Sequence, residues 1–451
     1  MPAIFVHVSD IHFGQERDER VHIHSDVKAQ LVADASEFVG RLPGTVAHGI
    51  LVTGDIAFSG VKEQYDDAGA WLDSLAQGIG CPIHSIQVIP GNHDVDRKKS
   101  SLSASHLLDV IRKGGASDYE RVLENDVDRA SLFARFEDFG RFCEGYDCAL
   151  DVHGRSSSNL RVELAPGRTI RFIRMNSSLL CTGDESDDEP ELMVGHRQFI
   201  IRPTKGEETI VLLHHPLNWY KDSEDANTYL RSRARVLITG HEHDPKVKVE
   251  EVEDGSDLLL LAAGATVPFK SDDIYTFTYN IIEFDWDSAA DALVVTIHPR
   301  AWNPNRARFE ADEKRLGGKC PRFVLGSPNF KNNASPQTLQ TDQNCAGSTA
   351  DIEVEPVVEI VAAQDSDMEL PVPPEVEGYR LLLLRFFRDL TEADRLRMLV
   401  ELGAFEDNSE ARVTQAIERQ LFDWLVRKGR IADIEASIQN ILDKKREDHA
   451  E

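Results

Sequence analysis

The residues that could do chemistry occur in five short segments, each of which combines aspartate, asparagine or histidine with small residues. In chain order the segments are SDIHFG, TGDIAFSG, PGNHD, LHHP and TGHEH. Their candidate site residues are Asp10, His12, Asp55, Asn92, His93, Asp94, His214, His215, His241 and His243. Carboxylate and amide oxygens with imidazole nitrogens are the donors typical of sites that hold two divalent cations. The segments therefore predict a two-metal centre.

The residue types indicate how the ligands divide between the two metals. Two cations about 3.5 to 4 Å apart need a bridging carboxylate, and Asp55 is the expected bridge. The other expected ligands are Asp10, His12 and His243 for one metal, and Asn92, His214 and His241 for the other. Such cations clamp phosphate oxygens and acidify a bridging water, so that a hydroxide can attack phosphorus in line.

The residues beside the expected ligands have expected roles of their own. His93 follows ligand Asn92 and is suited to protonating the leaving oxygen, while Asp94 could orient the His93 ring. We expect Asn92, His93 and His215 to contact the substrate. Taken singly each segment is weak, because an isolated Asp-x-His is common by chance. Together, in order along the chain, they favour the metal centre strongly.

Predicted strands place most of these residues. Four of the five segments directly follow an apolar run, and a strand that ends in Asp, His or Asn presents those side chains at the carboxyl edge of its sheet. The predicted strands are Ile4–Ser9, Gly49–Thr53, Ser85–Ile89, Ile170–Met175, Thr209–Leu213, Val236–Thr239, Leu258–Ala262, Tyr279–Phe284 and Leu293–His298. Helical patterns fall between them, including Asp26–Leu42, with Ser25 placed to cap it, and Ala130–Tyr146. This alternation predicts an α/β sandwich over 1–330.

Length, charge and composition set the limits of the interpretation. At 451 residues, one large domain and one smaller unit are expected. The formal charge of −28 shows no broad basic footprint, so nucleic acid is expected as a substrate at most. No apolar run is long enough for a membrane span, and the start reads as a strand instead of a signal peptide, so we expect a cytoplasmic protein.

The second half of the chain changes character twice. Residues 331–377 lose periodicity and gain Asn, Gln, Pro and acid, which predicts a flexible acidic linker. Residues 378–451 then read as a helical domain of four helices, broken near Thr391, Gly403 and Gly429. Its apolar stripes, which include Leu421 and Trp424, predict a small bundle core.

The five segments together resemble the calcineurin-like metallophosphoesterase superfamily. That resemblance implies a double β-sandwich flanked by helices and two divalent metal ions, which are Mn²⁺, Fe²⁺/Fe³⁺ or Zn²⁺. Purple acid phosphatases carry a Tyr three positions after the bridging Asp, whereas this chain has Phe58. GDIAFSGVKEQY, PGNHD, LHHP and GHEH are most similar to the class III cyclic nucleotide phosphodiesterase group. The resemblance implies phosphodiester hydrolysis; a phosphomonoesterase and an interaction scaffold retaining the fold stay open.

Two further features carry expectations. About 120 residues separate Asn92 from His214, and they include a helical insert near 101–146 that could cap the pocket. Arg97, Lys98 and Lys99 follow the PGNHD segment, where they are either substrate-phosphate contacts or a solvated loop. The C-terminal domain, with its ending FDWLVRKGRIADIEASI, resembles bacterial effector-associated, death-fold-like adaptor domains. That resemblance implies a protein partner bound through 378–451.

Overall fold

A computed structural model of the chain describes residues 1–15, 20–243, 245–252, 256–268, 277–312, 315–316, 321–331, 379–404 and 415–448. The chain divides into two compact units, Met1–Asn333 and Ala334–Glu451. The predicted linker at 331–377 lies outside the described residues apart from Lys331 at its start. Each unit is therefore described by itself.

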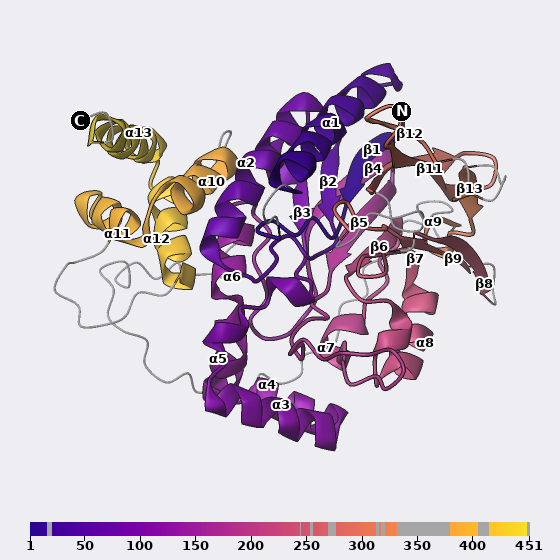
Figure 1. The fold of residues 1–451 in the computed structure, drawn as a ribbon, viewed down its shortest axis with the longest axis horizontal. Coiled ribbons are helices and arrows are strands. Elements are labelled where there is room, and N and C mark those ends of the chain that lie inside the picture. Colours follow the sequence, from indigo (N-terminus) through magenta and orange to yellow (C-terminus); the bar gives the residue numbers. More distant parts are fainter. Residues whose placement is uncertain are drawn as a thin grey trace, which may run out of the picture. The chain divides into compact units, whose positions relative to one another are not determined.

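The first unit contains two β-sheets (Figure 1). One sheet has the order β12 (Arg308–Ala311), β11 (Ala292–Asn303), β10 (Thr278–Asp287), β1 (Ala3–Val8), β2 (Gly49–Val52) and β3 (Ile86–Val88), with β13 (Arg322–Leu325) also paired to β11. Strands β1, β2 and β3 run parallel, and β10 is antiparallel to β1. The three parallel strands thus end at one edge.

The other sheet has the order β4 (Ser157–Ala165), β5 (Arg168–Arg174), β6 (Glu207–Leu213), β7 (Ala234–Thr239), β9 (Ser256–Ala262) and β8 (Val247–Val252). Strands β5, β6, β7 and β9 are parallel, while β4 and β8 pair antiparallel at the two sides. This sheet therefore also has a carboxyl edge formed by neighbouring parallel strands.

The two sheets share one apolar core. The ring of Phe5 on β1 lies 4.8 Å from the ring of Phe172 on β5 and 5.7 Å from that of Phe284 on β10. Leucine, isoleucine and valine side chains from both sheets join this cluster. All six residues of β1 and all seven of β6 are buried, as expected for strands covered on both faces.

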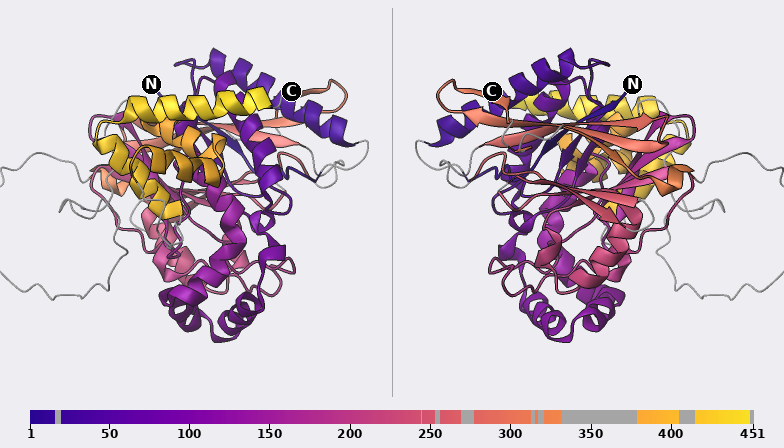
Figure 2. Two further views of the ribbon diagram at one scale, coloured as in Figure 1. Left: turned by 90° about the vertical axis from the view of Figure 1, so that its left-hand side faces the viewer. Right: turned by 90° about the vertical axis from the view of Figure 1, so that its right-hand side faces the viewer.

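Helices cover the outer faces of the two sheets (Figures 1 and 2). Helices α1 (Arg20–Arg41) and α2 (Lys62–Gly78) pack along each other beside the first sheet, where Asp34 of α1 binds Arg300 of β11 at 2.6 Å. Helices α7 (His196–Phe199) and α8 (Ser223–Arg233) accompany the second sheet. The short helix α9 (Pro328–Lys331) ends the unit by burying Phe330.

The insert between β3 and β4 is helical, as predicted. It contains α3 (Leu102–Gly114), α4 (Ala116–Glu124), α5 (Asp126–Phe133) and α6 (Glu137–Glu144), and α6 contacts α2. The single helix expected over 130–146 is interrupted by a 3-10 turn, η4, at Ala134–Phe136. Other 3-10 turns are η1 (Ile83–Ser85), η2 (Asn92–Asp94), η3 (Arg97–Lys99) and η5 (Leu217–Trp219).

The predicted fold class is confirmed: the chain is mixed α/β with two sheets and a helical C-terminal bundle. The structure adds β4, β8, β12 and β13, whose alternating or short patterns gave no continuous apolar run. Ser25 does not cap the first helix, because α1 already begins at Arg20 and Ser25 lies inside it.

The second unit is a helical bundle of α10 (Tyr379–Asp389), α11 (Glu392–Glu401), α12 (Gln415–Arg427) and α13 (Ile431–Asp448). The hydroxyl of Thr391 accepts a hydrogen bond from the Asp394 backbone and starts α11 as its N-cap. Gly403 and Gly429 end helices with φ of 74° and 75°, a conformation that favours glycine. Among the described helices, none combines the length and apolarity needed to cross a bilayer.

Candidate metal centre

The carboxyl ends of five parallel strands carry the candidate ligands. Asp10 and His12 follow β1, Asp55 follows β2, and Asn92 follows β3. His214 follows β6, and His241 and His243 follow β7 in the other sheet. The fold therefore gathers at one site residues that are spread over more than 230 positions of the chain.

The backbone at the site is strained. Asp10, His12 and Asp55 each have a φ of 52°, and His241 has a φ of 64°. Residues with side chains rarely adopt this left-handed conformation, and where it persists the surrounding structure must hold it. Four candidate ligands share a costly backbone conformation, which is typical of a functional site.

Close backbone approach explains two glycines of the segments. A Cβ atom at Gly91 would lie 2.2 Å from Asp55 Oδ1, and one at Gly240 would lie 2.2 Å from Ser9 Oγ. Neither position has room for a side chain. These glycines let the loops after β1, β2, β3 and β7 approach closely enough for their polar side chains to meet.

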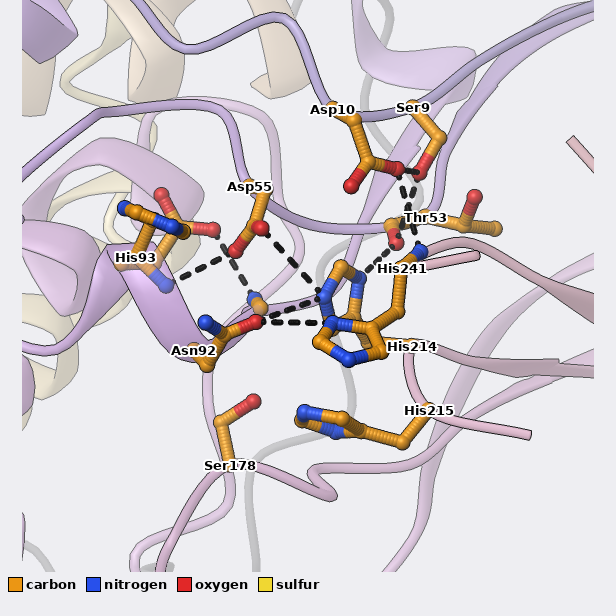
Figure 3. Close-up of polar contacts among 12 residues, drawn as sticks. Ser9, Asp10, Thr53, Asp55, Asn92, His93, Ser178, His214, His215 and His241 are labelled. Carbon is orange, nitrogen blue, oxygen red and sulfur yellow. Dashed lines mark hydrogen bonds and ion pairs between the residues drawn. The ribbon is translucent and has the colours of Figure 1, made fainter. Parts of the chain in front are cut away.

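Asp55 contacts members of both groups of predicted ligands, and Figure 3 shows it between His93 and His214. Its Oδ2 atom is 3.3 Å from His12 Nε2 and 3.5 Å from His214 Nε2. On one side, Asp10, His12 and His243 form a group whose donor atoms lie within 4.8 Å of one another. On the other side, Asn92 Oδ1 lies 3.2 Å from His214 Nε2 and 3.1 Å from His241 Nδ1. Each group contains residues that the sequence predicts as ligands of one metal, and Asp10 also lies in a candidate group with Asp55 and His214.

Backbone carbonyls define which nitrogen two of the histidines present. His214 Nδ1 lies 2.7 Å from the carbonyl oxygen of Thr53, and His12 Nδ1 lies 3.3 Å from that of Val267. A carbonyl only accepts, so Nδ1 carries a proton in each ring, and Nε2 is the nitrogen that faces Asp55, where it either shares a proton with the carboxylate or offers its lone pair to a cation. This is the usual arrangement of metal-binding histidines.

The electrostatics of the site fit cations. Burial raises the pKa of Asp55, but the charge of His214 and the hydrogen bond from His12 outweigh burial and hold that pKa well below its usual range. Burial likewise lowers the pKa of His214, yet Asp55 and Asp10 raise it to about 9. Protons on histidine here balance two buried carboxylates. Within the described part of the chain, buried Asp10 Oδ1 accepts no well-formed hydrogen bond and lies 3.5 Å from His243 Nε2, as expected for two atoms that could share a metal.

His93 lies next to this set. Its backbone N–H donates to Asp55 Oδ1 at 2.8 Å, its ring Nδ1 lies 2.8 Å from the Phe58 carbonyl, and the Phe58 ring stacks on it. Nδ1 therefore donates, which leaves Nε2 as the free nitrogen. The donor atoms of His93, His12 and Asp55 also lie close enough together to form a candidate metal group.

The role expected for Asp94 is wrong. The fully buried Asp94 carboxylate accepts from the backbone N–H groups of Ile56, Ala57 and Gly91, and from the Tyr65 hydroxyl at 3.0 Å. The Phe58 carbonyl, and not Asp94, bonds the His93 ring. Asp94 is thus a positioning residue that fixes the loop after β2 to the loop after β3.

His215, expected to contact the substrate, has its contacts inside the protein. His215 is fully buried, its Nδ1 lies 2.9 Å from Ser177 Oγ, and its ring lies 4.5 Å from the His241 ring. Burial and the charge of His241 hold the pKa of His215 well below its usual range, so the ring is neutral. His215 thus packs against His241, and its donor atoms form a candidate metal group with those of His214 and His241.

Sequence reasoning missed several neighbours of the site. Ser9 donates to the carboxylate of Asp10, and Trp219 lies with its ring 4.3 Å from the His241 ring. Ser178, which Figure 3 shows near Asn92 and His215, donates to the Pro90 carbonyl. Ser9 stands inside the first segment beside Asp10, whereas Trp219 and Ser178 have no pattern that marks them.

Comparison with known proteins agrees with the geometry. The family described as calcineurin-like phosphoesterase matches residues 4–245, and the GTPase-associated adaptor domain matches residues 378–440. The predicted adaptor-like character of the C-terminal segment is thereby confirmed. A search of curated protein sequences finds no match.

Among solved structures, the chain is similar in fold to a dimetal phosphatase from Danio rerio, with 13% identity, 69% of this chain and 99% of that chain covered, and a TM-score of 0.34. A Vps29 mutant from Entamoeba histolytica has 13% identity, coverage of 71% and 99%, and a TM-score of 0.30. A phosphatase from Mycoplasma pneumoniae has 12% identity, coverage of 74% and 97%, and a TM-score of 0.30.

Proposed function

This chain belongs to the calcineurin-like phosphoesterase family, and from that premise we propose that it hydrolyses a phosphodiester with a dinuclear metal centre. The proposed ligands are Asp10, His12, Asp55 and His243 for one metal, and Asp55, Asn92, His214 and His241 for the other. When bound, the two cations supply Lewis-acid chemistry and a nucleophile from water at neutral pH. The mixed oxygen and nitrogen donors suit manganese, iron or zinc.

The position of Asp55 carries this proposal. A single carboxylate oxygen lies 3.3 and 3.5 Å from histidine nitrogens that belong to the two ligand groups. Family relatives use a dinuclear site, and Asp55 is placed to join both halves of one. A lone buried aspartate that served only stability would not need donors gathered from five strand ends.

The remaining site residues have defined parts in the reaction. Because Nδ1 of His93 is bonded to Phe58, Nε2 is the nitrogen left for the leaving oxygen, and it would pass a proton to that oxygen in the imidazolium form of the ring. The carbonyl oxygens of Thr53 and Val267 orient the rings of His214 and His12, respectively, by accepting from their Nδ1 atoms. Asp94 ties the loop after β2 to the loop after β3, because its carboxylate accepts hydrogen bonds from three backbone N–H groups of these loops.

The diester is the substrate class to test first. Purified full chain with saturating Mn²⁺ should hydrolyse bis-p-nitrophenyl phosphate faster than p-nitrophenyl phosphate when both are compared by kcat/KM. A higher kcat/KM for the monoester would make the chain a phosphomonoesterase. If neither ester is hydrolysed although metal is bound, the phosphoesterase fold serves as an interaction scaffold.

For the second unit we propose recruitment of a protein partner through 378–451. The match to an adaptor domain supports this, as does the chemistry of the described bundle, whose buried polar residues pair with each other. Arg395 binds Glu418 at 2.9 Å and Tyr379 binds Asp423 at 2.6 Å, so these groups stabilise the bundle and are not poised for catalysis. Pull-down of partners with 378–451 tests the proposal.

A further inference from the structure

The segment after the ligand Asn92 carries a positively charged side chain, that of Arg97, beside the candidate metal centre. Turn η2 contains Asn92 and His93, and turn η3 begins at Arg97. The link between them is rigid, because buried Asp96 donates its N–H to the Arg135 carbonyl at 2.9 Å and its side chain caps η3 at Lys98. A Cβ at Gly60 would lie 2.7 Å from the Asp96 nitrogen, so the loop after β2 packs against this link. The Arg97 backbone is thus held in place.

The guanidinium of Arg97 lies on a glycine. A Cβ atom at Gly183 would be 2.6 Å from Arg97 Nη1 and 2.7 Å from Cζ, so only the absence of a side chain at Gly183 admits the guanidinium there. Gly183 has a φ of 108°, which other residues rarely adopt. In the structure the Arg97 guanidinium thus lies against the loop of Gly183, while its backbone belongs to the segment that follows His93.

The Gly183 loop is fixed by the helical insert. Arg135 donates to the carbonyls of Cys181 and Leu179, and Arg112 donates to the hydroxyl of Thr182 at 2.8 Å. At the other end of the loop Ser178 donates to the Pro90 carbonyl, one residue before the PGNHD glycine. The insert thus fixes the Gly183 loop beside the sheet edges that carry the candidate ligands, and the Arg97 guanidinium lies against this loop.

Arg97 is exposed, and no carboxylate in the described part of the chain lies within ion-pair distance of it. Glu185, the acidic residue of the same loop, accepts from the backbone N–H groups of Thr182 and Gly183 instead. Lys99 differs, because Glu137 and Asp138 of α6 bind it at 2.9 and 3.0 Å. Of the three basic residues after the PGNHD segment, Lys99 is structural, whereas Arg97 is open to a ligand.

The geometry points to Arg97 as a specificity-determining residue that binds a second phosphate of the substrate on the leaving-group side. The inference rests on the proposed diester hydrolysis. Arg97 begins η3 only four residues after His93, and the loop of Gly183 on which its guanidinium lies is bonded through Ser178 to Pro90, two residues before Asn92. A planar guanidinium with five donors suits a phosphate in particular.

The substrate class follows from this position. A cyclic mononucleotide offers one phosphate, which the metal centre would use, and leaves nothing for Arg97. A short nucleotide strand, or a dinucleotide with a terminal phosphate, offers a second phosphate beside the scissile one. The overall charge of −28 repels such a polyanion, so a local cation at the site would be needed to bind it.

The test compares diesters that differ in one phosphate. The probes are the thymidine dinucleotide TpT and TpT with a terminal phosphate at either end, and cleavage of the internal diester is followed by chromatography with saturating Mn²⁺. Wild type should prefer at least one phosphorylated probe over TpT by kcat/KM. In Arg97→Ala that preference should fall about tenfold, mainly through KM, and Arg97→Lys should fall between the two.

Lys98→Ala is the matched control, because Lys98 is an equally exposed neighbouring cation that does not lie on Gly183. Its preference should stay within about twofold of wild type. Equal losses in both variants would show a general field effect and overturn the inference, as would a wild type without preference. If the wild type cleaves bis-p-nitrophenyl phosphate but Arg97→Ala keeps the full preference, only this inference fails. If no diester is cleaved, the proposed function fails with it.

Discussion

The carboxylate of Asp55 contacts three residues of the candidate site, His12, His93 and His214, and Figure 3 marks its contacts with the last two. Asp55→Ala should therefore abolish hydrolysis and lower the metal content from two to less than one per chain, because both cations lose a ligand and the charge that holds them close. Metal analysis after gel filtration measures this. Asp66→Ala, an exposed acid on α2, is the control. Two metals per chain with normal turnover in Asp55→Ala would refute the bridging role.

His93 tests the division between ligands and proton donors. His93→Ala should lower kcat about 10² to 10⁴-fold with metal content nearly unchanged, because a general acid is lost and no ligand is. His106→Ala on α3 replaces an exposed histidine and should leave kcat unaltered. Since His93 also lies in a possible ligand group with His12 and Asp55, purification of His93→Ala without metal would make it a ligand.

At the scale of elements, strand β6 carries a buried acid away from the metals. Burial raises the pKa of Glu208 to about 7, although Arg235 at 3.4 Å and Asn329 oppose this rise. The folded state then keeps a proton that the unfolded chain releases above its ordinary value of 4.5. The contribution of Glu208 to the free energy of unfolding therefore falls as pH rises from about 4.5 to about 7.

Glu208→Gln removes that dependence. Wild type should lose stability relative to Glu208→Gln as pH rises from about 5 to about 8. The unfolding free energy of the variant minus that of wild type should increase by on the order of 3 kcal/mol over this range. Denaturant unfolding of both proteins at several pH values measures this difference. Glu251→Gln, on an exposed position of β8, serves as control. A difference that stays constant with pH would show that Glu208 is ionised throughout.

The parts of the fold that sequence could predict are those with a local cause. Strands such as β6 could be predicted because residues 210–213 form an apolar run, and the ligands could be predicted because parallel strands share a carboxyl edge. The hydrogen-bond partners of His93 and His215 could not be predicted from the sequence. Phe58 bonds His93 through its backbone carbonyl, a group that every residue has, and Ser177 lies 38 positions from His215 in the chain. The break at Ala134–Phe136 depends on tertiary packing, which periodicity does not report.

At the scale of the whole chain, catalysis and recruitment should be separable. The first compact unit ends at Asn333, and α9 within it buries Phe330 while Asn329 bonds Glu208. A truncation to 1–333 should therefore keep the specific activity of the full chain on bis-p-nitrophenyl phosphate with saturating Mn²⁺. A folded truncation that is inactive would show that the helical module completes or gates the active site.

The converse change unfolds the second unit alone. Phe422 is fully buried in the core of the bundle, whereas Trp424, which the sequence placed in that core, is only partly buried against it. Phe422→Ala should cost about 3 to 5 kcal/mol, enough to unfold a module of this size. The helical circular dichroism signal of 378–451 and its capture of a partner should both be lost. Glu435→Ala, a substitution at an exposed position, should preserve both. Full activity of the full-length Phe422→Ala chain on a generic diester is expected.

The central claim is a metal pair that hydrolyses a diester, and the most direct test is a titration of metal-free full chain with Mn²⁺ while hydrolysis of bis-p-nitrophenyl phosphate is followed. The account predicts that activity rises only as the second equivalent binds and saturates at two metals per chain, because Asp55 joins two ligand groups. Activity that saturates at one metal per chain, or that is the same without metal, would contradict it.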